Sequence, residues 1–152
     1  METHMEMPKK RSITGFGVFL IFMLVIVLWL YGNVKIVVIQ GTSMVPTFQP
    51  GRRLVVTDAY WLFGKIQPDD IVVVKEFIKK EGGYFIKRVK FVEGEKVERA
   101  YWPKAYPIKS PDYTVPNDMF FLLGDNRDYS EDSRSFGPIK EDLVIGKVLV
   151  WR

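Results

Sequence analysis

The sequence predicts a mainly β protein preceded by a single N-terminal helix, and two observations carry this prediction. The first is a series of short β-branched runs, bounded by Gly, Pro, Asp and Asn, without helical periodicity between them. The second is one long uncharged apolar run near the N-terminus. Many short strands without intervening helices are typical of an antiparallel β domain. A chain of 152 residues accommodates one such domain plus an appendage.

The apolar run extends from Ile13 to Tyr31, and Thr14 is its only clearly polar residue. As a helix it would be roughly 28 Å long, close to the ~30 Å hydrocarbon core of a bilayer. Trp29 and Tyr31 lie at its end, where interfacial aromatic residues are expected. A buried helix of a soluble protein and a cleaved signal peptide are the alternatives. The run exceeds an ordinary signal-peptide core and no Ala-x-Ala-like site follows it, so we expect an uncleaved anchor.

The charges on either side of this run predict its orientation. Lys9, Lys10 and Arg11 precede the run, whereas Lys35 alone follows it closely. Positive residues favour the cytoplasmic side of a membrane span. The expected organisation in the cell membrane is therefore a cytoplasmic tail at 1–12, a single transmembrane anchor at 13–31 and a β-rich domain on the outer face at 32–152.

The β-branched runs predict the strands of that domain. Turn signals such as Pro50-Gly51 and Glu93-Gly94 separate them. A proline-rich segment, 100–116, is expected to be irregular and exposed. The expected strands are Lys35–Gln40, Arg53–Thr57, Ile71–Lys75, Tyr84–Val92, Met119–Leu123 and Leu143–Trp151.

Composition excludes several kinds of chemistry. The chain has no cysteine, which rules out disulfides, thiolate metal sites and cysteine nucleophiles. Its one histidine, His4, lies in the polar N-terminal tail, so a Ser-His-Asp triad is not expected. A net charge of +4 is too small to indicate a nucleic-acid partner. No metal or organic cofactor is indicated.

The stretch Gly41–Thr47 presents a serine, Ser43, in a predicted turn. Gly permits positive φ and Pro fixes φ, so the backbone bends here and can direct the hydroxyl outward. An ordinary strand-to-turn link is the plain alternative. A serine hydroxyl becomes a good nucleophile only when a nearby base removes its proton, and without a usable histidine that base must be a carboxylate or a lysine.

Lys87 has the sequence surroundings that such a lysine needs. Strand alternation places Phe85, Lys87 and Val89 on one face, and Ile86 and Arg88 on the other. Burial between apolar neighbours disfavours the ammonium form and lowers the pKa of a lysine from about 10.4. The alternative is an exposed lysine on an edge strand, where its charge discourages aggregation.

Two further stretches allow more than one interpretation. The polar stretch 124–134 follows the apolar strand Met119–Leu123; it is either a solvated loop or a fixed ion-pair network that holds a site rigid. The aromatic cluster Tyr60–Phe63 is either core packing, which we favour, or a surface lip that enters the bilayer.

Three of these stretches together resemble the motif boxes of bacterial type I signal peptidases, membrane-bound Ser/Lys proteases that remove signal peptides. Their order along the chain matches the family, as does the anchor before the first box. The third box is highly specific, whereas Ser-Met-x-Pro alone is weak. The matching residues are Gly41-x-Ser43-Met44-x-Pro46-Thr47, Lys87-Arg88-Val89 and Gly124-Asp125-Asn126-Arg127-x-x-Ser130-x-Asp132-Ser133-Arg134-x-x-Gly137.

The resemblance implies a role for each matching residue. Ser43 would be the acylating nucleophile, with its backbone N–H in the oxyanion hole, and Lys87 would be the general base and later the general acid. Ser130 would hydrogen-bond the Lys87 amine. The supporting ion pairs would be Asp132 with Arg134 and Asp125 with Arg88, while Met44 and Pro46 would lie near the substrate and the membrane.

The resemblance also implies the fold, the substrate and the partners. The fold would be the β-rich fold of the LexA-like superfamily, and a signal peptide would bind as an extended strand and be cut after a small-x-small sequence. The lipid bilayer and the Sec translocon would be the neighbouring partners. The sequence departs from the family at Gly41, where some members carry a serine that adds an oxyanion donor, and at Glu95, which replaces an Asp.

Other members and relatives of the superfamily are the rival interpretations. Self-cleaving repressors carry a DNA-binding domain where this chain has its apolar run. Archaeal and endoplasmic-reticulum peptidases usually have His in place of Lys87. Mitochondrial inner-membrane and thylakoid peptidases share the boxes and remain alternatives, as does a catalytically silent, membrane-anchored module that binds extended peptides.

Overall fold

A computed structural model describes residues 15–77, 83–104 and 112–149. The chain divides into two compact units, residues 1–32 and 33–152. The first unit contains nearly all of helix α1, Gly15–Asn33. By length and composition α1 could cross a membrane, and none of its side chains is buried. The helix ends two residues later than the predicted run, at Asn33, and the first two residues of that run, 13 and 14, lie outside the described residues.

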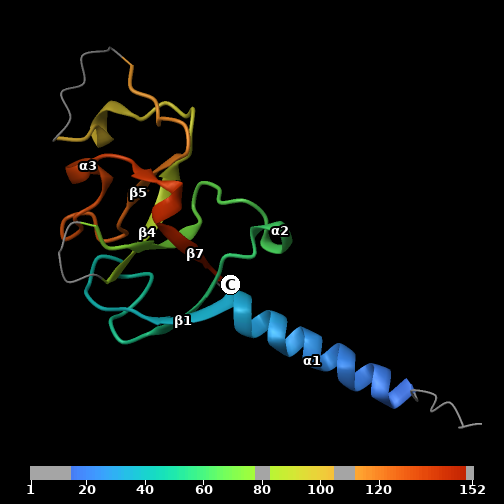
Figure 1. Cartoon of the computed structure of the whole chain (residues 1–152). Helices are drawn as coiled ribbons and strands as arrows, with labels where there is room; N and C mark the ends of the chain where they lie inside the picture. Colours follow the sequence, from blue (N-terminus) through green and yellow to red (C-terminus); the bar gives the residue numbers. More distant parts are fainter. Residues whose placement is uncertain (1–14, 78–82, 105–111, 150–152) are drawn as a thin grey trace, which may run out of the picture. The chain divides into compact units, whose positions relative to one another are not determined.

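Within the described residues, the second unit is built on one antiparallel sheet of seven strands, in the order β1-β2-β7-β3-β4-β5-β6. Figure 1 labels β1, β4, β5 and β7 of this sheet. The sheet confirms the prediction of a mainly β fold. Short helical turns connect the strands: α2 (Tyr60–Phe63), η1 (Arg99–Tyr101), α3 (Ser133–Phe136) and η2 (Glu141–Leu143). The strands are β1 (Val34–Val38), β2 (Arg53–Thr57), β3 (Ile71–Lys75), β4 (Tyr84–Phe91), β5 (Met119–Leu123), β6 (Ile139–Lys140) and β7 (Val144–Val148).

All six predicted strands are present, with small differences in the bounds of some of them. β1 begins one residue earlier and ends two residues earlier than the predicted strand Lys35–Gln40. β2, β3 and β5 have the predicted bounds, and β4 ends one residue early. β7 begins at Val144 because Leu143 closes the preceding helical turn. The two-residue strand β6 was not predicted, since two residues are too few to show any periodicity. The predicted end of the last strand, 150–152, lies outside the described residues.

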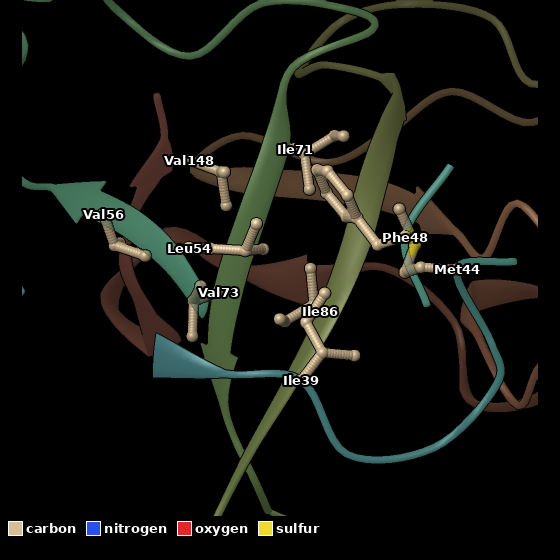
Figure 2. Close-up of a cluster of buried hydrophobic side chains, with 9 residues drawn as sticks. All are labelled: Ile39, Met44, Phe48, Leu54, Val56, Ile71, Val73, Ile86 and Val148. Atoms are coloured by element: carbon tan, nitrogen blue, oxygen red, sulfur yellow. The ribbon is translucent and has the colours of Figure 1, made fainter. Parts of the chain in front are cut away.

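Alternating side chains of the sheet pack into separate apolar clusters. Ile71, Val73 and Ile86 belong to the cluster drawn in Figure 2, whereas Val72 and Val89 belong to another. This division follows the pleat, which sends successive side chains to opposite faces. Each fully buried aliphatic side chain stabilises the fold by about 1.5–3 kcal/mol, and the clusters hold β4 rigidly from both sides.

The proline-rich segment 100–116 is less exposed than the sequence predicted. Its described residues include the buried Pro103 and Val115. The Trp102 indole N–H donates to the Val97 carbonyl, and the ring packs against the cluster that contains Phe121. Aromatic and β-branched side chains between the prolines therefore fold this segment onto the sheet. The remaining positions, 105–111, lie outside the described residues.

The expectation that Tyr60–Phe63 packs in the core is wrong for three of its four residues. Only Tyr60 packs against a core cluster. Trp61, Leu62 and Phe63 form the outer side of the one-turn helix α2 and are 75%, 53% and 40% exposed. A single helical turn directs its side chains around the full circle, so it cannot bury all of them against one sheet.

Candidate active site

Ser43 is half-buried in a turn that follows β1. Gly41 has φ +89°, a left-handed conformation that a residue with a Cβ adopts only with strain. Met44 and Phe48 are buried and point into the apolar cluster, as Figure 2 shows. Pro46, by contrast, is exposed. The turn is thus anchored by its apolar side chains, which fixes the position of the serine next to Met44.

Lys87 is 4% exposed, in the middle of β4. The alternation predicted from the sequence is confirmed, because Phe85 and Val89 pack in one cluster and Ile86 in another. The alternative of an exposed lysine is wrong, because the Lys87 side chain is buried. The amine Nζ lies 5.7 Å from the centre of the Phe85 ring.

Burial lowers the pKa of the Lys87 amine, because an ammonium is poorly solvated there. The negative charges of Asp132, Glu131 and Glu76 oppose this shift without overcoming it. Within the described residues, no salt bridge joins Lys87 to a carboxylate. The neutral amine, which can accept a proton, therefore forms at a lower pH than for a lysine in water.

Asp132 and Arg134 form the ion pair that the sequence predicted. The Asp132 side chain is fully buried, and Arg134 Nε lies 2.9 Å from its Oδ1. The Gly124 N–H also donates to Asp132, at 3.1 Å. Burial alone would raise the pKa of the Asp132 carboxyl, but the hydrogen bonds from Arg134 and Gly124 hold it below the usual range. The stretch 124–134 thus contains a fixed ion pair, although Asp128, Tyr129 and Glu131 within it are exposed.

Asp125 and Arg88 form a second pair, also as predicted. Arg88 donates through Nε at 2.8 Å and through Nη2 at 2.7 Å, a bidentate geometry that fixes both side chains. The Thr47 hydroxyl donates to the same carboxylate. Burial opposes these contacts, but they keep the pKa of Asp125 low. This network links the serine turn, through Thr47, to the strand that carries the lysine.

Asn126 connects the loop 124–134 to the serine turn. It was not predicted as a site residue from the sequence. Its backbone N–H donates to the Ser43 carbonyl at 2.9 Å, and its Nδ2 donates to the Thr42 carbonyl at 3.2 Å. Its place in the third motif box, beside Asp125, was the only sequence signal. The three predicted stretches thus come together at one site.

Ser130 is placed against this site by a close contact with Gly124. Its Oγ is buried and makes no hydrogen bond within the described residues, so the expected bond to Lys87 is not formed in this structure. A Cβ added at Gly124 would lie 2.0 Å from Ser130 Oγ and 2.8 Å from the Ser43 carbonyl oxygen. Only glycine therefore fits where this loop passes the serine turn.

We expect Gly124→Ala to lower the free energy of unfolding by about 1–3 kcal/mol, the range typical of overpacking. The Ser130 hydroxyl could rotate away, but the Ser43 carbonyl belongs to the backbone and can move only with its turn. Urea denaturation of the full chain in detergent measures the effect. Gly32→Ala is the matched control, since a Cβ there meets nothing within 4 Å. Equal stability of the two variants would show that the loop relaxes freely.

A pocket of about 200 Å³ opens beside Ser43. The strand register leaves room for a peptide there: β4 pairs with β3 over its whole first half but meets β5 only from Arg88 onward. The other side of the Tyr84–Lys87 segment thus has no strand neighbour in the described sheet. The pocket is lined by Val37, Val38, Ile39, Gln40, Ser43, Met44, Gly83, Tyr84, Phe85 and Ile86.

Among the residues that the structure describes, no three His, Cys, Asp or Glu side chains are grouped so that they could hold a metal ion.

The chain is similar to several known proteins. The chain is 35% identical to mitochondrial inner membrane protease subunit 2 of Saccharomyces cerevisiae, over 78% of this chain and 68% of that protein. It is 30% identical to signal peptidase IB of Staphylococcus aureus, over 72% and 73%. A signal peptidase I structure from Enterococcus faecalis matches 57% of this chain and 97% of that one, with 28% identity and a TM-score of 0.42.

The family described as "Signal peptidase, peptidase S26" matches residues 11–102 and 99–151. These two segments include the serine turn, β4 and the loop 124–134, which are the parts that build the site. The chain belongs to the signal peptidase family, peptidase S26.

Proposed function

We propose that this protein is a membrane-bound signal peptidase I, a serine endopeptidase that uses a Ser43–Lys87 dyad. Family membership supports a peptidase that acts on signal peptides. The observation that carries the dyad is the burial of Lys87, 4% exposed, on the strand whose preceding residues line the pocket of Ser43. A lysine whose pKa is lowered by burial can serve where histidine serves in other serine proteases.

The chemistry follows from the protonation state of the amine. Neutral Lys87 accepts the proton of the Ser43 hydroxyl as the oxygen attacks the scissile carbonyl. The ammonium then returns the proton to the leaving amine, and the signal peptide remains as an ester on Ser43. Lys87, neutral again, deprotonates the water that attacks this ester and then gives that proton to the departing Ser43 oxygen, which releases the signal peptide and restores the free enzyme. Ser130 is the proposed partner of the amine during these transfers.

The substrate strand is proposed to lie along the open side of β4, next to the end of β1. Tyr84–Lys87 offers backbone groups for pairing with an extended peptide. The pocket is small and lined largely by apolar side chains such as Val37, Ile39 and Ile86. These features suit small residues such as Ala at the positions before the cleavage site.

The proposed topology follows from the anchor and its charges. Helix α1 would span the membrane, with the tail 1–12 in the cytoplasm and the unit 33–152 on the outer face. Exported preproteins would then reach the site as they leave the Sec translocon. We place the protein in the cell membrane as a single-pass enzyme.

The direct test is cleavage of a preprotein with an Ala-x-Ala site by the purified full chain in detergent. We expect the wild type to cut after the second Ala and Ser43→Ala to fall to background. The Ser43 hydroxyl makes no hydrogen bond in the described structure, so Ser43→Ala should stay folded, which circular dichroism checks. A wild type that binds the preprotein without cutting it would support the peptide-binding module instead.

Contact between α2 and lipid is part of this proposal. Trp61, Leu62 and Phe63 together present an exposed apolar surface, and aromatic side chains favour the membrane interface. With the protein reconstituted in vesicles that contain brominated lipid, we expect Trp61 to be quenched. Trp61→Ala should therefore remove part of the quenching seen in the wild type.

Trp102→Phe is the matched control for this measurement. Trp102 is half-buried against Tyr113, in the cluster under the proline-rich segment, so bromine in the bilayer should not reach it. Equal quenching of the wild type and Trp61→Ala would show that α2 stays in water.

A further inference from the structure

Asn126 contacts both peptide groups that flank the nucleophile. Its backbone N–H donates to the Ser43 carbonyl at 2.9 Å. Its side-chain Nδ2 donates to the Thr42 carbonyl at 3.2 Å, and the Val45 N–H donates to that same carbonyl at 3.1 Å. The Thr42 oxygen is therefore held from two directions, one within the turn and one from the loop 124–134.

The Thr42 carbonyl and the Ser43 N–H belong to one planar peptide group. Donors that fix the oxygen therefore also fix the direction of the N–H at the other end. The Ser43 N–H itself donates to no acceptor within the described residues. It is free to meet a ligand, and a carbonyl that accepts hydrogen bonds makes the N–H of the same peptide a stronger donor.

We infer that the Asn126 side chain positions the oxyanion donor of this enzyme through the Thr42–Ser43 peptide. The inference rests on the proposed function, in which the Ser43 N–H stabilises the oxyanion formed on the scissile carbonyl. Asn126 does not touch the reacting atoms, so it is a positioning residue. Arg88 and Asp125 hold the same turn at Thr47, farther from the peptide that donates.

The test compares Asn126→Ala with the wild type, both as full chains in detergent. Removing a direct oxyanion donor lowers kcat by roughly 10²–10³-fold, so an indirect loss should lower it by about tenfold or more. KM should stay within about twofold, because the side chain contacts the enzyme's own backbone and not the substrate. The midpoint of the pH–rate profile should not move, since Lys87 keeps its surroundings.

A pair of ligands separates positioning from a general structural role. A peptide aldehyde forms a tetrahedral adduct with Ser43 and needs the oxyanion donor, whereas the matching peptide alcohol does not. Asn126→Ala should weaken binding of the aldehyde by the same factor by which it lowers kcat. It should leave the affinity for the alcohol unchanged. Asn117→Ala, an exposed asparagine outside the site, should change neither.

Asn126→Asp provides the second variant. It keeps the volume and the backbone bond to Ser43 but places an acceptor against the Thr42 carbonyl, so kcat should fall at least as far as in Asn126→Ala. This variant decides the question if thermal melting shows Asn126→Ala to be unfolded. If the wild type is active and the folded variants keep its kcat, the inference is overturned and the proposed function stands. The same holds if binding of the aldehyde and of the alcohol is weakened equally. An inert wild type would overturn the proposed function.

Discussion

Replacing Lys87 by Met is expected to lower kcat by about 10³-fold or more, because general-base and general-acid catalysis are lost together. Methionine fills a similar volume and suits the apolar surroundings of a side chain that is 4% exposed. The variant should be at least as stable as the wild type at neutral pH, since it no longer buries an ionisable amine. Preprotein cleavage and urea denaturation measure the two effects.

The same amine sets the expected pH dependence of the wild type. Burial lowers the pKa of Lys87, so the neutral, active form appears at a lower pH than for a lysine in water. Cleavage should rise with pH and reach half of its plateau below about 10.4, the ordinary lysine pKa. A rate independent of pH across this range would contradict the role of Lys87 as the base.

Lys90→Met is the matched control on the same strand. Lys90 is half-buried and stands over the rings of Phe91 and Tyr101, away from the pocket residues. Lys90→Met should keep both the cleavage rate of the wild type and the midpoint of its pH–rate profile. A similar loss in both variants would mean that β4 as a whole, and not the Lys87 amine, was disturbed.

Asp132→Ala is expected to destabilise the fold by about 3 kcal/mol, the lower part of the range for breaking a buried ion pair. Three donors, the Arg134 guanidinium, the Arg134 backbone N–H and the Gly124 N–H, would lose their acceptor. The lower part applies because the Arg134 side chain is 26% exposed and water can solvate it. Urea denaturation at neutral pH measures the loss, and Asp142→Ala, at an exposed carboxylate, is the control.

The free energy of unfolding at acidic pH provides a second measurement of this ion pair. The pKa of Asp132 is lower in the folded chain than in the unfolded one. Its contribution is therefore fully present above the unfolded value of about 3.9 and is lost as the pH falls through the folded pKa. Asp132→Ala should lose less stability than the wild type over that range. Parallel acid curves for the two proteins would contradict the assignment.

Local sequence signals predicted much of the fold. Three strands have the predicted bounds because β-branched runs between turn residues specify a strand without help from distant residues. The predictions that failed concern burial. Trp61 is exposed and Val115 is buried, and neither outcome follows from composition, since both depend on which surface the folded chain provides nearby.

In the candidate site, too, relations between nearby residues were predicted and contacts between distant segments were not. Alternation along β4 identified the face of Lys87, because the pleat relates residues that are close in the chain. The pair of Asp132 with Arg134 came from the resemblance to the motif box. The bonds from Asn126 to Thr42 and Ser43 join positions that are far apart in the chain. The hydrophobic periodicity of the sequence does not predict such a contact.

The sequence by itself determined the anchor-like helix, the strands and the residue types that the chemistry needs, since these depend on local hydrophobicity and backbone preference. Only the tertiary structure decided that Lys87 is desolvated, that Gly124 passes against the Ser43 carbonyl, and that the Ser43 N–H is left without an internal acceptor. Desolvation and close approach arise when segments distant in sequence pack together, and that packing exists only in the folded chain.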